Sequence, residues 1–332
     1  MFNTLSPAFD YNNQLKYTEC NKEAAMRLLI LGAGATGGFY GGRLLQAGRD
    51  VTFLVRPGRA EQLNRSGLSI RSTQGQEDTY IAVPPFITSV NGPFDLIILS
   101  CKAYQLDDAI KAIAPAVDNG SMVLPILNGM KHLEILDRHF GREHVLGGAC
   151  LVSSTLDAEG TILQFGEAQS LIFGEREGGV SNRCSAIAEF MAPANFTTKL
   201  SETIMQDMWE KWVANSTIAG ITALMHNSIG NIVSAPGGKE LVLQLFDECS
   251  SVASAYNFPP RQNFRQRQID FMSDTTSEIK ASMCRDVERG APTEAAHFAK
   301  KIDKLSTPWR PYRSLACWYF WKHTNLSRTP GE

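Results

Sequence analysis

The chain has 332 residues, of which 43% are hydrophobic and 20% are charged, and its formal net charge is −2. This length accommodates two domains, and the balanced charge excludes a general attraction of the chain to nucleic acid or to an anionic membrane. No apolar run approaches the ~20 residues needed to cross a bilayer. Residues 1–25 lack the basic start and apolar middle of a signal peptide, so we expect a poorly ordered extension.

The seven cysteines and six histidines are scattered along the chain, and none forms a C-x-x-C pair. His139 and His144 are the closest histidines, but their spacing does not place two ligands on one helical face. This usage is typical of a reducing compartment and argues against a metal site or a redox dithiol. We therefore expect a cytoplasmic protein without a bound metal.

Short apolar runs alternate with helical patterns in the first part of the chain. They predict strands over 27–34, 51–56, 68–72, 80–87, 95–102 and 122–129, with a helix over 103–117. Such alternation is typical of an α/β fold, here a Rossmann-type, mostly parallel sheet. Turn-rich sequence over 145–175 predicts antiparallel strands added to that sheet, and a last strand is expected over 196–201. The remaining sequence is helical, which predicts a nucleotide-binding domain over 26–200 and an all-helical domain over 201–332.

The first apolar run ends in the sequence GAGATG, which has the G-x-G-x-x-G spacing. Gly32 permits a tight turn, Gly34 lets a pyrophosphate approach the backbone, and Gly37 lets the helix lie close to the sheet. The N–H groups at the start of the helix, including those of Ala35 and Thr36, are suited to bind phosphates. These five residues are therefore candidate cofactor contacts. The alternative is an ordinary glycine corner.

The residue that ends the second apolar run indicates which dinucleotide binds. Enzymes that use NAD usually place Asp or Glu at this position to bind the ribose 2′-hydroxyl. Here the run ends in Arg56, with Arg59 shortly after it. A guanidinium is a better partner for a 2′-phosphate, so we expect NADP(H). The alternative is that Arg56 is a solvated charge at a strand end.

Five segments in order resemble the ketopantoate reductases (2-dehydropantoate 2-reductases). They lie within residues 26–296 and read GAGATGG, CKAYQ (101–105), LNGM (127–130), WEKWVANSTIAGITAL (209–224) and ASMCRDVERGAPTE (281–294). The resemblance implies a Rossmann-type domain followed by a helical domain. It also implies the NADPH-dependent reduction of a small 2-oxo acid to a 2-hydroxy acid, in a pathway leading to pantothenate.

Candidate catalytic residues come from the helical half. Lys211 and Asn215 are four residues apart and share one face of a helix, so both side chains can meet one ligand. The resemblance implies that Lys211 is the general acid, that Asn215 binds substrate, and that Glu294 contacts the substrate hydroxyl groups and carbonyl. The alternatives are a solvated lysine and an acid that merely favours the first turn of a helix.

Four further residues complete the candidate site. Asn128 ends a buried strand, at the edge where α/β sheets bind ligands, although Asn-Gly is also an ordinary turn. The resemblance implies that Asn128 contacts both cofactor and substrate and that Lys102 lies near the adenosine ribose and its phosphate. It also assigns Ser282 to the substrate carboxylate and Asp286 to a substrate contact or a supporting role.

Some positions depart from the family pattern. Ala219 stands where many relatives have a second helical Asn, and Ala295 and Ala296 also differ. The last 33 residues resemble the family only loosely; an apolar helix face there would suit core closure or a homodimer (Leu315, Trp318, Tyr319 and Trp321). Two other functions therefore stay open: reduction of a different branched 2-oxo acid, and a non-catalytic NADP(H)-binding sensor or interaction protein. The basic stretch 259–268 is interpreted as a solvated loop and helix start rather than an RNA contact.

Overall fold

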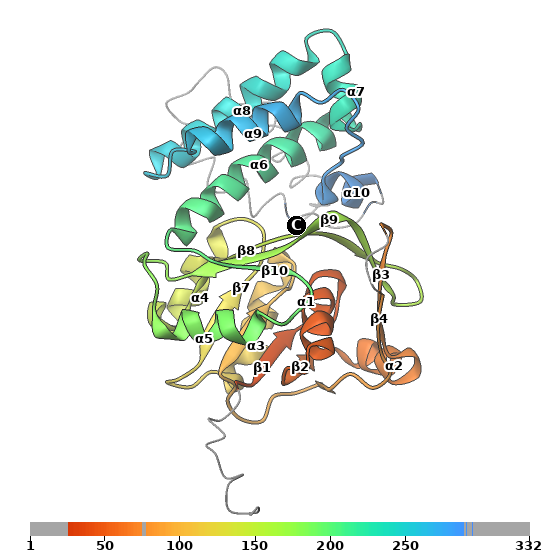
Figure 1. The fold of residues 1–332 in the computed structure, drawn as a ribbon, viewed down its shortest axis with the longest axis vertical. Helices are drawn as coiled ribbons and strands as arrows, with labels where there is room; N and C mark the ends of the chain where they lie inside the picture. Colours follow the sequence, from red (N-terminus) through yellow and green to blue (C-terminus); the bar gives the residue numbers. More distant parts are fainter. Residues whose placement is uncertain (1–25, 75–77, 289, 291–293, 295–332) are drawn as a thin grey trace, which may run out of the picture.

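The computed structural model describes residues 26–74, 78–288, 290 and 294 (Figure 1). The extension expected over 1–25 and the apolar face around residues 315–321 lie outside these residues. Figure 1 shows two lobes: a sheet-containing lobe, and above it a lobe of helices in which α6, α8 and α9 lie side by side. The fold class predicted from the sequence, a parallel-sheet domain followed by helices, is confirmed.

A parallel sheet of five strands forms the centre of the first lobe. Its order is β5-β2-β1-β6-β7, and the strands cover Phe86–Ile87, Val51–Leu54, Leu28–Leu31, Leu96–Leu99 and Met122–Pro125, respectively. In the register, Leu29 lies opposite Thr52 on one side and opposite Ile97 on the other. All residues of β6 and β7 are buried, because other elements cover both faces of a parallel sheet.

The strands expected over 145–175 form part of a second sheet instead of extending the first. The hairpin of β8 (Gly147–Leu156) and β9 (Ile162–Gly174) is antiparallel, as expected. However, β9 then pairs in parallel with β10 (Thr197–Leu200) and with β3 (Leu68–Ser72), and β3 pairs with β4 (Thr79–Ile81). The expectation of additions to the parallel sheet is therefore wrong. Helix α1 (Ala35–Gln46) lies between the two sheets and packs on both.

The segment 80–87 was expected to form one strand, but it is divided between the two sheets. β4 ends at Ile81 and β5 begins at Phe86, and each is an edge strand of its sheet. Pro84 and Pro85 between them have no N–H group and cannot continue a ladder. The proline pair therefore marks the point at which the chain passes from one sheet to the other.

Helices cover the sheets of the first lobe. They are α1, α2 (Pro57–Ser66), α3 (Leu106–Ile113), α4 (Lys131–Phe140) and α5 (Asn182–Met191). Three short 3-10 helices cover Ala103–Gln105, Ala114–Ala116 and Arg142–His144. Helix α1 can pack tightly because of its glycines: a Cβ on Gly41 would lie 2.5 Å from the Phe53 ring.

The helical lobe begins directly after β10. It contains α6 (Ile204–Met225), α7 (Ile229–Ser234), α8 (Gly238–Ala255), α9 (Gln262–Met272) and α10 (Ser282–Glu288). Helix α6 has 22 residues and is buried on most of its circumference; it ends at His226, whose φ is 51°. Trp209 and Trp212 of α6 belong to the same apolar cluster as Leu29 and Leu99 of the sheet. One core therefore connects the two lobes.

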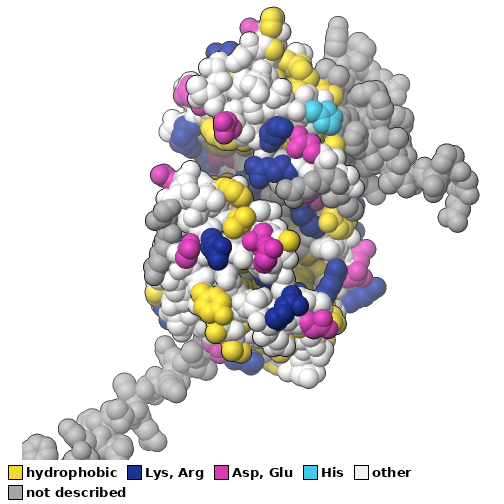
Figure 2. Space-filling model, turned by 90° about the vertical axis from the view of Figure 1, so that its right-hand side faces the viewer, with side chains coloured by type: hydrophobic (Ala, Val, Ile, Leu, Met, Phe, Trp, Pro, Cys, Tyr) yellow, Lys and Arg dark blue, Asp and Glu magenta, His cyan; other side chains and the backbone are white. Residues whose placement is uncertain are grey.

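The surface of the described residues carries charges of both signs. No helix among them is long and apolar enough to cross a bilayer. On the face that Figure 2 shows, Lys and Arg side chains are interspersed with Asp and Glu. Such mixing does not produce the large field of one sign that attracts a polyanion.

Candidate functional site

The glycine loop joins β1 to α1 and opens onto a cleft. Gly32 has a φ of +93°, a conformation that residues with a Cβ rarely adopt. A Cβ on Gly37 would lie 2.2 Å from Ser100 Oγ and 2.3 Å from the carbonyl oxygen of Gly32, whereas a Cβ on Gly34 would meet no atom within 4 Å. Gly37 is thus required for packing, while Gly34 leaves room for a ligand at the backbone.

The first turn of α1 is suited to an anion. Gly34 is the N-cap and provides no side-chain oxygen, so the first N–H groups of the helix have no capping partner from it. The first turn contains no acidic residue, and Ala35 and Thr36 line the cleft. The partial positive charge of the helix start is therefore directed at the cleft.

Two arginines follow β2, and they differ in their partners. Arg56 is the N-cap of α2; its exposed side chain lines the cleft, and its guanidinium makes no hydrogen bond or ion pair within the described part of the chain. Arg59 donates to the carbonyl oxygens of Ala33 at 2.9 Å and Gly160 at 3.2 Å. Burial lowers the pKa of Arg59, against the opposing effect of Asp157. Arg59 therefore braces the glycine loop, and Arg56 is available to a ligand.

The cleft lies between the lobes and has a volume of about 1040 Å³. Most residues that the sequence nominated line it, and they come from both lobes: Gly32, Gly34, Ala35, Thr36, Arg56, Lys102 and Asn128 from the first, and Lys211, Asn215, Ser282 and Glu294 from the second. Gly37 and Asp286 are not among the lining residues. Gly37 acts through packing, and Asp286 contacts the site through Lys102.

Helix α6 directs Lys211 and Asn215 into the cleft. The ammonium of Lys211 donates at 3.8 Å to Sγ of Cys150, which belongs to β8 on the other side of the cleft. One turn further along, the Asn215 amide donates to Asn128 Oδ1 at 3.4 Å. The structure thus brings Lys211, Asn215 and Asn128 to one cleft, from both lobes. The pairing of Lys211 with Cys150 could not be expected, since 61 residues separate the two.

A second contact between the lobes involves Lys102, which follows β6. Its ammonium is 3.3 Å from Asp286 Oδ2 and 3.9 Å from Glu294 Oε2. Burial alone would lower the pKa of Lys102, but the carboxylates of Glu294 and Asp286 outweigh it and raise the pKa. Glu294 is buried and also accepts from the backbone N–H of Ala103 at 3.0 Å. Lys102 is therefore charged and bound to two carboxylates of the helical lobe.

The cleft contains two thiols that play different parts. Burial is the main reason that the pKa of Cys101 is raised to about 11, so its thiol stays protonated. Cys150 also lines the cleft and donates to the carbonyl oxygen of Ile126 at 3.4 Å. Sequence reasoning missed Cys150 because a single cysteine in a strand carries no sign of its partner.

Among residues 26–74, 78–288, 290 and 294, no group of three or more His, Cys, Asp or Glu side chains is placed to hold a metal ion. The polar groups of the cleft are instead suited to an anionic organic ligand: a helix start, a free guanidinium, and a lysine with two amides opposite. Such a set can bind phosphates at one end and polarise a carbonyl at the other.

Comparison with known proteins agrees with this geometry. Residues 28–178 match the family model described as Ketopantoate reductase PanE/ApbA, and residues 203–306 match the model of its C-terminal part. The chain belongs to the ketopantoate reductase family. It is an oxidoreductase of the 2-dehydropantoate 2-reductase type that acts on a small 2-oxo acid, which confirms the family and enzyme class expected from the five sequence segments.

Relatives of the ketopantoate reductase family match most of the chain. The uncharacterized oxidoreductase YkpB of Bacillus subtilis (strain 168) is 35% identical over 82% of this chain and 89% of its own length. A 2-dehydropantoate 2-reductase of Archaeoglobus fulgidus is 30% identical over 84% of this chain and 90% of its own. The crystal structure of 2-dehydropantoate 2-reductase from Geobacter metallireducens GS-15 superposes with a TM-score of 0.81 at 25% identity, covering 90% of this chain and all of that one.

Proposed function

We propose that this protein reduces 2-dehydropantoate to pantoate with NADPH and that Lys211 is the general acid. The observation that carries this proposal is the position of Lys211: it reaches from the helical lobe into the same cleft as the glycine loop of the sheet lobe. A ketone that accepts a hydride builds negative charge on its oxygen, so the site needs a proton donor opposite the cofactor.

The cleft residues fit a nicotinamide dinucleotide. The open face of Gly34 and the free N–H groups of Ala35 and Thr36 would hold the pyrophosphate. We assign the 2′-phosphate of NADPH to Arg56, because its guanidinium is free while that of Arg59 is engaged. Lys102 would add a second cation near this phosphate or the ribose. When bound, the cofactor supplies the hydride.

The remaining residues would orient the 2-oxo acid and supply the proton. Lys211 would donate a proton from Nζ to the carbonyl oxygen as that oxygen becomes an alkoxide. Asn215 and Asn128, already in contact, would fix the plane of the carbonyl group. Ser282, exposed at the start of α10, would bind the substrate carboxylate, and Glu294 would accept from the substrate hydroxyl group.

Steady-state kinetics test this assignment. The purified protein should oxidise NADPH when 2-dehydropantoate is added, and Lys211→Ala should lower kcat by about two to four orders of magnitude, the range for a lost acid. Lys239→Ala is a matched control, because Lys239 is exposed on α8 and does not line the cleft. A Lys211→Ala variant with nearly unchanged kcat would remove this lysine from the chemistry.

Ala219 favours a second candidate, the reduction of another branched 2-oxo acid. It lines the cleft two turns beyond Lys211, next to Ile218, and offers a methyl group where an amide would bind a substrate hydroxyl. A panel of 2-oxo acids compared by kcat/KM separates the two substrates. If NADPH binds but no 2-oxo acid is turned over, the protein is a cofactor-binding sensor instead.

We place the reaction in the cytoplasm and expect a homodimer, which light scattering can test.

A further inference from the structure

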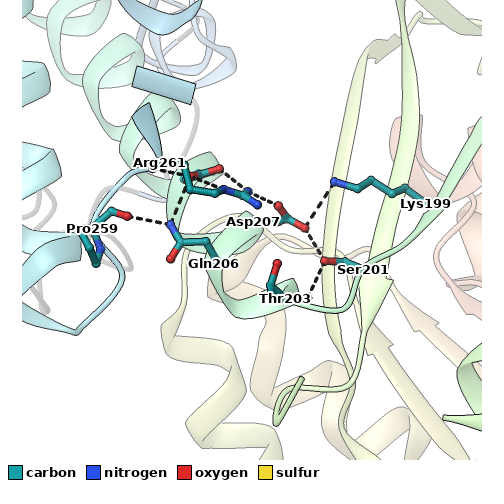
Figure 3. A network of polar contacts seen from close by, with 8 residues as sticks. Lys199, Ser201, Thr203, Gln206, Asp207, Pro259 and Arg261 are labelled. Carbon is teal, nitrogen blue, oxygen red and sulfur yellow. Dashed lines mark hydrogen bonds and ion pairs between the residues drawn. The ribbon is translucent and has the colours of Figure 1, made fainter. Parts of the chain in front are cut away.

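A network of charged side chains lies at the start of α6 (Figure 3), and its residues do not line the cleft. The guanidinium of Arg261, the N-cap of α9, binds Asp207 Oδ1 and donates to both carboxylate oxygens of Glu210, at 2.8 and 2.6 Å. The other oxygen of Asp207 accepts from Ser201 at 2.5 Å and lies 3.7 Å from the ammonium of Lys199. The network thus joins β10, α6 and α9.

The two carboxylates depend strongly on Arg261. The side chains of Asp207 and Glu210 are only 7% and 5% exposed, so the half-exposed guanidinium of Arg261 is their main charged partner and shields them from solvent. Glu210 also accepts from the backbone N–H of Arg261 at 2.8 Å and from Gln206 at 3.2 Å. Hydrogen bonds to Glu210, which outweigh burial, raise the pKa of Arg261, with a further contribution from Asp207. The guanidinium therefore stays charged at every pH at which an enzyme works.

The position of Asp207 relative to Lys211 gives this network a consequence for the cleft. The two residues are four apart on α6, with the acid on the N-terminal side, which is the spacing and order that favour an ion pair. Lys211 nevertheless reaches Cys150 across the cleft and makes no ion pair with the described carboxylates. Arg261 and Lys199 already place two positive charges at Asp207, and Ser201 donates a hydrogen bond to it, so the attraction of this carboxylate for Lys211 is largely offset.

We propose that Arg261 is a positioning residue for Lys211: by occupying Asp207 Oδ1, it keeps the lysine ammonium directed into the cleft. This inference rests on Lys211 being the general acid. The other charged and titratable groups that line the cleft belong to other elements and make no hydrogen bond or ion pair with Arg261: Arg56 and Arg59 after β2, Cys101 and Lys102 after β6, Asp108 of α3, Cys150 of β8, and Lys280, Arg285 and Glu294 around α10.

Substitution of Arg261 separates positioning from simple support of the fold. In Arg261→Met, Asp207 Oδ1 loses its partner and can take the ammonium of Lys211 one turn away. An opposite charge at this range raises the pKa of a lysine by about 1 unit or more. We expect kcat to fall by about tenfold or more with little change in KM, since the cleft contacts remain. The alkaline limb of the kcat profile should move to higher pH by about the same unit.

Two double variants identify which carboxylate matters. Arg261→Met with Asp207→Asn removes the competing charge at the favourable spacing and should restore kcat and the pH profile. Arg261→Met with Glu210→Gln removes an equally buried charge, but Glu210 directly precedes Lys211 and does not share its helix face. It should improve stability without restoring kcat. Arg265→Met is the matched single control, because Arg265 pairs with the exposed Asp247 at 2.6 Å.

The pKa of Lys211 can also be measured without turnover, from the pH dependence of its acetylation read by mass spectrometry. A raised value in Arg261→Met, reversed only by Asp207→Asn, supports the proposal. An unchanged value, or equal rescue by the two double variants, would overturn it and leave Arg261 a purely structural residue. If the labelling result holds but the parent protein reduces no 2-oxo acid, the proposed function fails while the positioning of Lys211 stands.

Discussion

The glycine loop allows a sharp prediction, because two of its glycines have different roles: Gly37 is needed for packing of the protein, and Gly34 leaves space for a ligand. In Gly37→Ala the new methyl group would lie 2.2 Å from Ser100 Oγ and 2.3 Å from the carbonyl oxygen of Gly32. The serine side chain can rotate, but the backbone carbonyl cannot withdraw without moving the turn. Overpacking of this kind costs typically about 1–3 kcal/mol, and we expect the upper end of that range.

Gly34→Ala should behave in the opposite way. Its φ of −83° and ψ of −163° are accessible to alanine, and the added Cβ meets no protein atom within 4 Å. The free energy of unfolding should therefore stay within about 0.5 kcal/mol of the parent value. If the pyrophosphate approaches this backbone, the methyl group should weaken NADPH binding by about 10- to 100-fold.

Urea unfolding of the ligand-free variants and fluorescence titration with NADPH measure the two effects separately. The expected pattern is a stable Gly34→Ala that binds the cofactor poorly and a destabilised Gly37→Ala. Adding Ser100→Ala to Gly37→Ala should recover only part of the stability, since the Gly32 carbonyl remains. Unimpaired NADPH binding by Gly34→Ala would refute the assignment of the pyrophosphate to this loop.

Three further predictions concern single charges. Arg56→Asp should weaken NADPH about 10- to 100-fold more than NADH, because a forked charged contact is worth about 1.5–3 kcal/mol; equal losses in parallel titrations would exclude a contact with the 2′-phosphate. Glu294→Gln should lower kcat/KM for the 2-oxo acid by about 10- to 100-fold without raising the Kd for NADPH. If only the affinity for NADPH fell, Glu294 would be a cofactor contact instead. Hydrogen bonds from Arg183 hold the pKa of Glu175 at about 2, against 4.5 when unperturbed, so its contribution to stability is present above pH 4.5 and disappears toward pH 2. Glu175→Gln should accordingly unfold more easily than the parent protein at pH 7, and a difference that persists unchanged at pH 2 would contradict this origin.

Much of the fold follows from local pattern. The apolar runs over 27–34, 51–56 and 95–102 contain the adjacent parallel strands β1, β2 and β6, because continuous apolar sequence suits a strand buried on both faces. The second sheet could not be predicted in this way. Strand β3 pairs with β9 about 90 residues later, and alternation within a strand does not specify its neighbour.

In the candidate site, too, local spacing predicts some contacts, whereas contacts between distant residues have no signal in the sequence. Lys211 and Asn215 could be placed together because helical spacing fixes their relation. The ion pair of Lys102 with Asp286, 184 residues apart, has no local signal, and neither does the contact of Arg261 with Glu210 across 51 residues. The stretch 259–268 illustrates the limit: α9 begins within it and Arg261 is exposed, as expected, but the pattern gave no sign that Arg261 also pairs with two buried carboxylates.

The position of Lys211 relative to the glycine loop depends on the apolar core as well as on polar contacts. Trp209 and Trp212 of α6 flank Lys211 and are buried in the cluster that contains Leu29 and Leu99 of the sheet. Tilting α6 away from the sheet would expose this surface at a cost of about 25 cal/mol for each Å². The polar contacts of Arg261 hold the first turns of α6 in one rotation about the helix axis. The two tryptophans hold α6 at a fixed distance from the sheet. Because Trp209 and Lys211 lie on different faces of α6, one helix can anchor in the core and still present an ammonium to the cleft.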